Sequence, residues 1–380
     1  MEALAALETH LRERVNDIKE RKNKGAKVVG FVPGFTPEEL IYASGAIPLG
    51  LLEGGDSSAI AASSAYMTRF VDTFCRAQVG YYMSGEHPLY QLPDLVVIPS
   101  ADDNFRALID VLVQVGNIEV FRLGIPHERT DIAVDFYVEM IGLLKKKLEG
   151  LVGTPIEDNK LQEAIELYNQ MRKSLNDLGQ TRQSPRPVLT GKEYARINHA
   201  SYVGDVKTVT EICNSLINEV KGKEGRDSKP RVLLVASTLA MNDYKVHDIL
   251  EEAGASVVFE ETCEGTRQCW EEVKPEGDLL SALGDKYIRR RTPPPPFFHP
   301  PEGRYEFLIE KARDYKVDGI VWYELLYRES YETELFYFSR KLEKDLGIPL
   351  VVLQSEYDLS ETATFRTRIE AFVESIKGRK

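Results

Sequence analysis

The sequence has few cysteines, no excess of basic residues and no apolar run long enough to cross a bilayer. Its 380 residues include four cysteines and carry a net charge of −12. Four thiols in a chain of this size do not suggest the disulfide framework of a small secreted protein. Residues 1–8 are acidic and show no basic region followed by an apolar block. We therefore expect a cytoplasmic globular protein that binds neither membranes nor nucleic acids.

Two common nucleotide-binding motifs are also missing. No G-x-G-x-x-G follows the first expected strand, and no G-x-x-x-x-G-K-[ST] occurs. The sequence gives no support for ATP or NAD binding by this chain. If the system uses ATP, a partner must supply it.

Short apolar runs alternate with helical patterns at both ends of the chain. We expect strands at residues 27–32, 94–99, 119–123, 231–237, 256–260, 318–322 and 349–353. Strands separated by helices of ten or more residues are typical of βαβ units and parallel sheets. Residues 130–220 are almost wholly helical in pattern, and residues 222–230 form a polar linker rich in Gly. The sequence predicts an α/β fold: two doubly wound, Rossmann/flavodoxin-like domains (residues 1–150 and 226–380) joined by a helical connector (residues 151–225).

The same pattern predicts where a ligand would bind. Among the expected helices, one opens at Thr36-Pro37 and another runs over residues 65–84. Ligands of doubly wound sheets bind outside the carboxyl ends of the strands. The loops expected to line the cleft are those after residues 32, 99, 237, 261 and 323.

Several segments carry a family resemblance. They are residues 32–49 (VPGFTPEELIYASGAIPL), the helix with Cys75, and residues 95–103, 260–267, 318–329, 348–358 and 367–372. Together they resemble the benzoyl-CoA reductase / 2-hydroxyacyl-CoA dehydratase family, in particular a D-component-like subunit. The resemblance implies a CoA-thioester substrate, a paralogous partner subunit in a heterodimer, and low-potential electrons from an ATP-dependent activator in an anaerobe. It leaves open whether the reaction is dehydration or reduction.

The resemblance also implies a [4Fe-4S] cluster, which this family usually holds with three cysteines per subunit. Cys75 stands at the first of these positions, but Ala101 stands at the second and Arg328 at the third. Alanine has no ligating atom, and a guanidinium has no lone pair to donate. A cluster in this chain would need Cys75 with Cys263 and Cys269; otherwise it lies in a partner subunit. The alternatives are a cluster-less, non-catalytic partner or scaffold subunit, in which Cys75 is a buried core thiol.

Basic and acidic side chains supply further candidates. Arg267, Arg289, Arg290 and Arg291 are candidates for binding CoA phosphates, against the alternatives of a structural ion pair for Arg267 and a solvated loop for the other three. Glu53, in a loop expected to face the cleft, is a candidate acid/base group.

A stiff polyproline stretch, residues 292–301, allows three interpretations. It lines the acyl-CoA entrance, docks a partner, or forms a rigid connection between helices.

Overall fold

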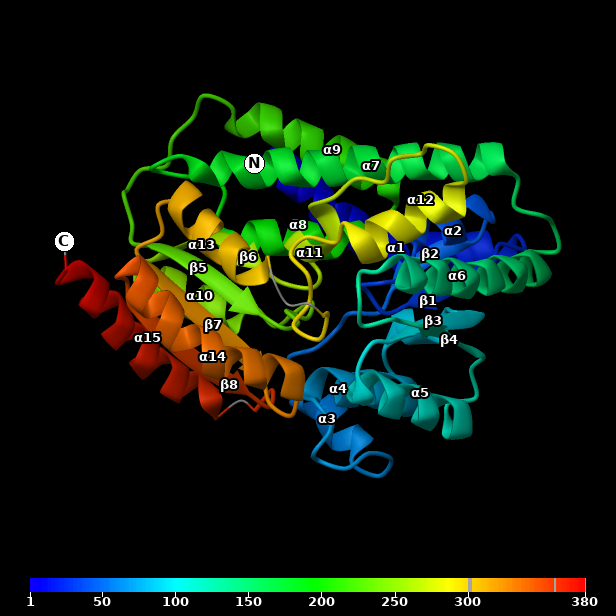
Figure 1. The fold of residues 1–380 in the computed structure, drawn as a ribbon, viewed down its shortest axis with the longest axis horizontal. Coiled ribbons are helices and arrows are strands. Elements are labelled where there is room, and N and C mark those ends of the chain that lie inside the picture. Colours follow the sequence, from blue (N-terminus) through cyan, green and yellow to red (C-terminus); the bar gives the residue numbers. More distant parts are fainter. Residues whose placement is uncertain (300–302, 359, 380) are drawn as a thin grey trace.

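The computed structural model describes residues 1–299, 303–358 and 360–379. It contains two four-stranded sheets, one in each half of the chain (Figure 1). The first has the order β2-β1-β3-β4 and the second β6-β5-β7-β8, and every strand is parallel to its neighbours. The strands are β1 (Val28–Phe31), β2 (Ile47–Gly50), β3 (Leu95–Ser100), β4 (Val120–Gly124), β5 (Arg231–Ala236), β6 (Ser256–Glu261), β7 (Gly319–Leu325) and β8 (Leu350–Ser355). The predicted fold class is confirmed.

The central strands are buried because helices cover both faces of each sheet. Every residue of β1, β5 and β7 is buried, which is why these strands read as continuous apolar runs without alternation. At the start of β7 the packing is so close that a Cβ on Gly319 would lie 2.6 Å from the Phe372 ring. Glycine therefore lets the last helix approach the sheet.

Helices make up most of the rest of the chain. Those of the first half are α1 (Glu2–Asn23), α2 (Glu38–Ala43), α3 (Ser57–Ser63), α4 (Thr73–Ser84), η1 (Pro88–Gln91), α5 (Asp103–Val115) and α6 (Asp131–Val152). Those of the middle are α7 (Asp158–Gln180), η2 (Thr181–Gln183), α8 (Gly191–Val203) and α9 (Val206–Val220). Those of the last part are α10 (Lys245–Glu252), α11 (Thr266–Cys269), α12 (Leu279–Gly284), η3 (Asp285–Arg289), α13 (Arg304–Asp314), α14 (Glu329–Leu346) and α15 (Glu361–Lys377). None of the helices in the described ranges is both long and apolar enough to cross a membrane.

The middle helices pack on both halves of the chain. Helix α7 packs against α2 of the first half and against α11 and α12 of the second, and it runs along the top of both sheets in Figure 1. Residues 270–298 also cross between the halves. Within them α12, which follows β6 of the second sheet in sequence, packs on α6 of the first half. There a Cβ on Gly284 would lie 2.6 Å from the Val138 side chain.

Two local predictions were wrong. Strand β2 was not expected, because its four residues include Pro48 and Gly50; proline is tolerated because β2 is an edge strand. The helix expected over residues 65–84 begins only at Thr73 and is preceded by the separate helix α3. A Cβ on Gly80 would lie 1.9 Å from the Ala59 carbonyl oxygen, so α3 and α4 are in close backbone contact.

Candidate functional site

The carboxyl ends of the two sheets meet at one junction between the halves of the chain. Glu53, just after β2, forms an isolated parallel bridge with Met241, which follows β5. Asn104 donates a hydrogen bond of 2.9 Å to the carbonyl of Tyr327, after β7. Because the carboxyl ends of parallel strands are where such folds bind ligands, this junction is the candidate site.

Arg328 lies at the centre of this junction. Its guanidinium pairs with the Asp102 carboxylate at 3.2 Å and donates a 2.6 Å hydrogen bond to Thr238. It also lies 5.1 Å from the centroid of the Phe105 ring and is only 3% exposed. Burial lowers the pKa of Arg328, but Asp102 and the nearby Asp72 carboxyl raise it well above its ordinary value. The position expected for a third cysteine is thus occupied by a cation that joins the two halves of the protein.

Cys75 lies close to this ion pair but is fully buried in the first helix turn of α4. Its backbone N–H donates to Asp72, the N-cap residue, at 2.9 Å. Burial, together with the Asp72 and Asp102 charges, raises the pKa of the Cys75 thiol well above its ordinary value. The Cys75 thiol is therefore neutral and packed in the core. At the second expected cysteine position, the backbone carbonyl of Ala101 accepts a hydrogen bond from His127 Nε2 at 2.8 Å.

The other candidate cysteines do not join Cys75. Cys269 is buried in the core between the middle helices, with its thiol 3.9 Å from the Asn198 side-chain oxygen. Cys263 follows β6 and lies against the loop after β1. A Cβ on Gly34 of that loop would stand 3.2 Å from the Cys263 sulfur. No three His, Cys, Asp or Glu side chains in the described part of the chain are placed to hold a metal ion. The residues present therefore do not fit the three-cysteine cluster implied by the family resemblance.

Three of the four candidate arginines are occupied by carboxylates of the protein. Arg267 donates to Glu261 at 2.5 Å and to the Ala236 carbonyl at 2.7 Å, and it is 2% exposed. Arg289, on the surface, pairs with Asp131 at 2.5 Å. Arg290 pairs with Asp285 and lies 3.4 Å from Glu271. These contacts support the structural ion pair for Arg267 and solvated surface pairs for Arg289 and Arg290.

Arg291 differs from the other three. It is 2% exposed, and its Nε, Nη1 and Nη2 have no hydrogen-bond partner among the described residues. Its guanidinium carbon lies 4.3 Å from the centroid of the Phe35 ring. Burial lowers its pKa, while the Cys263 thiol acts in the opposite direction. A buried guanidinium without a partner is energetically costly, so this side chain is available to a ligand.

Glu53 lies at the junction, buried at 4% exposure. Its carboxylate accepts a hydrogen bond of 2.5 Å from the Asn242 side chain, and its carbonyl accepts one of 2.8 Å from Gln78. Burial raises its pKa to about 7, although the Asn242 hydrogen bond lowers it. The group therefore exchanges a proton near neutral pH, which is the property a general acid or base requires.

Other buried acids at the junction were not predicted. Glu264 accepts a 3.0 Å hydrogen bond from the Leu239 N–H, and burial raises its pKa to about 7. Glu324, on β7, accepts a 3.1 Å hydrogen bond from the Trp322 indole, and burial raises its pKa to about 8. Both lie at or just after the carboxyl end of a strand, which is the signal that could have identified them.

A cavity of about 570 Å³ opens beside the Arg328–Asp102 pair. Ala101 and Asp102 form one side of it, and Pro296, Phe297 and His299 of the polyproline stretch form another. This segment therefore lines a pocket beside the junction, and Pro300 and Pro301 lie outside the described residues.

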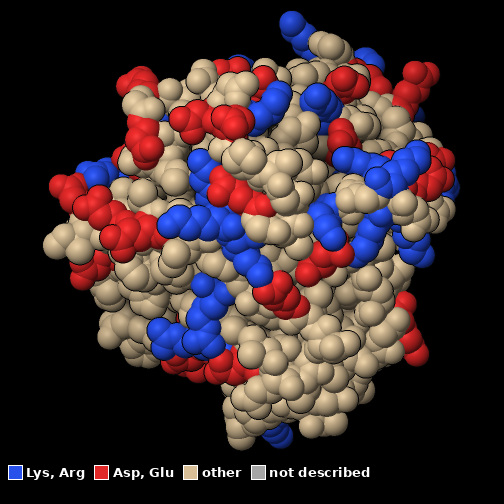
Figure 2. Space-filling view, turned by 90° about the vertical axis from the view of Figure 1, so that its right-hand side faces the viewer, with Lys and Arg blue, Asp and Glu red and all other residues tan. Residues whose placement is uncertain are grey.

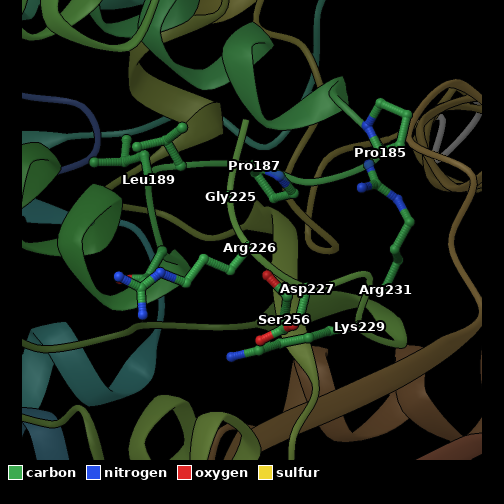
Figure 3. Close-up of a pocket in the computed structure, with 11 residues that line it drawn as sticks. Pro185, Pro187, Leu189, Gly225, Arg226, Asp227, Lys229, Arg231 and Ser256 are labelled. Atoms are coloured by element: carbon green, nitrogen blue, oxygen red, sulfur yellow. The ribbon is translucent and has the colours of Figure 1, made fainter. Parts of the chain in front are cut away.

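Other surface features lie away from the junction. A pocket of about 240 Å³, drawn in Figure 3, is lined by Arg226, Arg231 and Ser256 among others and lies at the amino ends of β5 and β6. Figure 2 shows Lys and Arg side chains interspersed with Asp and Glu over one face of the molecule. Neither feature adds a residue to the candidate site.

Comparison with known proteins identifies the family of this chain. The profile of the family described as "2-hydroxyglutaryl-CoA dehydratase, D-component" matches residues 33–376. The β subunit of (R)-phenyllactyl-CoA dehydratase from Clostridium sporogenes is 24% identical over 362 residues, 94% of each chain. The putative dehydratase subunit YjiM of Escherichia coli K12 is 26% identical over 95% of this chain and 94% of its own. A benzoyl-CoA reductase subunit from Thauera aromatica is 24% identical over 78% of this chain and 77% of its own. The chain belongs to the 2-hydroxyglutaryl-CoA dehydratase D-component family, which includes subunits of 2-hydroxyacyl-CoA dehydratases and of benzoyl-CoA reductase.

Proposed function

We propose that this chain is one subunit of a cytoplasmic 2-hydroxyacyl-CoA dehydratase or benzoyl-CoA reductase-type complex that acts on a CoA thioester. In this proposal a paralogous partner subunit holds the [4Fe-4S] cluster, and an ATP-dependent activator supplies it with low-potential electrons. This chain completes the cleft without a cluster of its own. The observation that carries the proposal is the buried Arg328–Asp102 ion pair at the position expected for a cluster cysteine.

The donor set explains why the cluster is assigned to the partner. An iron–sulfur cluster needs several thiolates, and of the three expected cysteine positions only Cys75 remains, with a thiol that is neutral in the core. Arg328 and Ala101 provide no ligand. A second copy of the family fold, with its own cysteines, would supply what this chain lacks.

The residues of this chain have a different task in the proposal. The cavity beside Ala101 and Asp102 would receive part of the thioester, and the aromatic ring of Phe297 forms an apolar part of its wall. Glu53, with its pKa raised to about 7, would hold or release a proton at the junction. These roles are binding and proton transfer, which need no metal ligand from this chain.

Helix α6 of this chain offers a suitable surface for the partner subunit to bind. Ile132 is 81% exposed, Phe136 43% and Leu143 52%. Residues four and eleven positions apart lie on one face of a helix, so these three side chains form an apolar stripe. Subunit interfaces bury stripes of this kind.

The test is the iron and acid-labile sulfide content of protein purified without oxygen, alone and with any co-purifying subunit. We expect no stoichiometric iron in the chain alone and iron in the complex. The double variant Ala101→Cys/Arg328→Cys, which restores three cysteines with Cys75, should gain iron, whereas the matched Ala101→Ser/Arg328→Ser variant should not. Stoichiometric iron in the parent chain that is lost in Cys75→Ala would overturn the assignment of the cluster to the partner.

A second candidate function rests on the same ion pair. If neither this chain nor its complex contains iron, the chain is a cluster-less scaffold subunit. Binding of an acyl-CoA to the isolated chain, measured by calorimetry, separates the two, because a scaffold has no reason to retain an acyl-CoA cavity. Absence of both acyl-CoA binding and a paralogous partner in pull-down would reject the enzyme subunit.

A further inference from the structure

The Arg291 side chain is the least compensated charge of the junction. All three guanidinium nitrogens are buried, and none of them makes a hydrogen bond to another group in the described part of the chain. Arginine keeps its charge at ordinary pH even when it is buried. Native structures rarely leave all three nitrogens of one buried guanidinium without a hydrogen bond, and a ligand that accepts from them would account for the arrangement.

The described groups around Arg291 include no anion that would neutralise its positive charge. Those that act on it most strongly are the Cys263 thiol, the Arg267 guanidinium and the hydroxyls of Tyr287 and Tyr331, none of which is an anion at neutral pH. Arg267 is itself neutralised by Glu261. Among the described residues, nothing neutralises the single positive charge of Arg291.

The space beside Arg291 is defined by Cys263 and Gly34. Cys263 is the one cysteine that keeps exposed surface, although it lies between the two sheets. The backbone of Gly34 approaches it so closely that a Cβ would stand 3.2 Å from the sulfur. The Phe35 ring, next in sequence, lies under the guanidinium. The loop after β1 thus lies against both the Cys263 sulfur and the Arg291 guanidinium, and Gly34 has no side chain to fill the space beside the sulfur; we call this place the Gly34–Cys263 cradle.

We propose that Arg291 and the adjacent Gly34–Cys263 cradle form a binding site for a small carboxylate. A planar guanidinium presents two parallel N–H donors that match the two oxygens of a carboxylate. One monovalent anion neutralises this charge, whereas the phosphates of CoA carry more charge than one guanidinium compensates. Where the acyl group of a substrate carries a free carboxylate, this site would hold that carboxylate. Only this assignment of the ligand to a substrate rests on the proposed function.

The test uses the reactivity of Cys263 in the full chain. Iodoacetate carries a carboxylate, whereas iodoacetamide is its neutral analogue, and each alkylates a thiol with loss of iodide and a proton. We expect Cys263 to prefer iodoacetate over iodoacetamide about tenfold more strongly than a free thiol does, because hydrogen bonds to a charged group add that much affinity. The rate should saturate with iodoacetate, and acetate or propionate should compete. Mass spectrometry of the Cys263 peptide measures both rates, and the three buried cysteines serve as internal controls.

The matched variants are Arg291→Gln and Arg289→Gln, two residues apart in one segment. Arg291→Gln should abolish the preference and the saturation, whereas Arg289→Gln, on the surface, should keep both. Arg291→Lys should keep part of the preference, which separates loss of charge from loss of fold, and thermal unfolding checks each variant. Equal preference in parent and Arg291→Gln, or no alkylation of Cys263 by either reagent, would overturn the proposal. Stronger competition by inorganic phosphate than by acetate would overturn the assignment to carboxylates.

Discussion

Two buried arginines lie at the junction of the sheets, and they differ in what surrounds them. Arg328 pairs with Asp102 and with Thr238, each from a different half of the chain. Arg291 has no hydrogen-bond partner within the described ranges and lies against an aromatic ring. Both are about equally buried, at 3% and 2% exposure. Burial alone therefore does not tell a structural cation from a ligand-binding one; the partners of the guanidinium do.

The difference also clarifies how this chain departs from the usual cluster-binding pattern of its family. Ala101, at the second expected cysteine position, is a neutral replacement. Arg328, at the third, carries a charge that the protein neutralises with Asp102. The charge of Arg328 is thus neutralised within the protein. The charge of Arg291 has no hydrogen-bond partner among the described residues, which leaves it open to a ligand.

The largest expected effect is on Arg328. Replacement by methionine leaves Asp102 largely buried and without its counter-charge, which should lower the free energy of unfolding by about 4 kcal/mol. Chemical denaturation of the full chain measures this value. The double variant Arg328→Met/Asp102→Asn should recover much of the loss, because both charges are then gone. A loss below about 1 kcal/mol, typical of surface pairs, would show that the pair is not a structural link.

Glu53 gives the next largest effect, since this buried acid has no cationic partner in the part of the chain that the structure describes. Burial raises its pKa from 4.5 to about 7 in the folded chain, so the folded state binds a proton that the unfolded state has released. Stability therefore falls as the pH rises from 4.5 to 7, by about 3 kcal/mol for this group. Glu53→Gln should remove this part of the pH dependence and be more stable than the parent at pH 8. Denaturation curves at pH 5 and pH 8 measure the difference, and an unchanged pH slope would contradict it.

Much of the fold could be predicted from the sequence, because buried parallel strands read as apolar runs. The strands expected at residues 27–32 and 231–237 end within one residue of the observed bounds of β1 and β5. Strand β2 was missed because Pro48 and Gly50 oppose a strand locally, and its edge position compensates only in the assembled sheet. The alternation also predicts a ligand cleft at the carboxyl ends of the strands, and loops that follow strands of the two halves meet there.

The candidate site was less predictable because side-chain partners depend on tertiary contacts. Arg289, Arg290 and Arg291 are adjacent in sequence, yet only Arg291 is turned into the core, where residues 270–298 cross onto α6. The pairing of Arg328 with Asp102 joins residues 226 positions apart, which no local pattern reveals. Charge type and strand ends could be read from the sequence, whereas the pairing of charges could not.

The smallest expected effect has the opposite sign to that of Arg328. Arg291→Met should leave the free energy of unfolding unchanged or raise it by about 1 kcal/mol in buffer without carboxylates, because it removes an uncompensated buried charge and adds apolar contact with Phe35. Added acetate should stabilise the parent but not the variant, because a ligand stabilises only the state that binds it. Thermal unfolding with and without acetate measures both effects. A large destabilisation by Arg291→Met would place Arg291 in the same class as Arg328, and the distinction between a paired and an open arginine at this junction would fail.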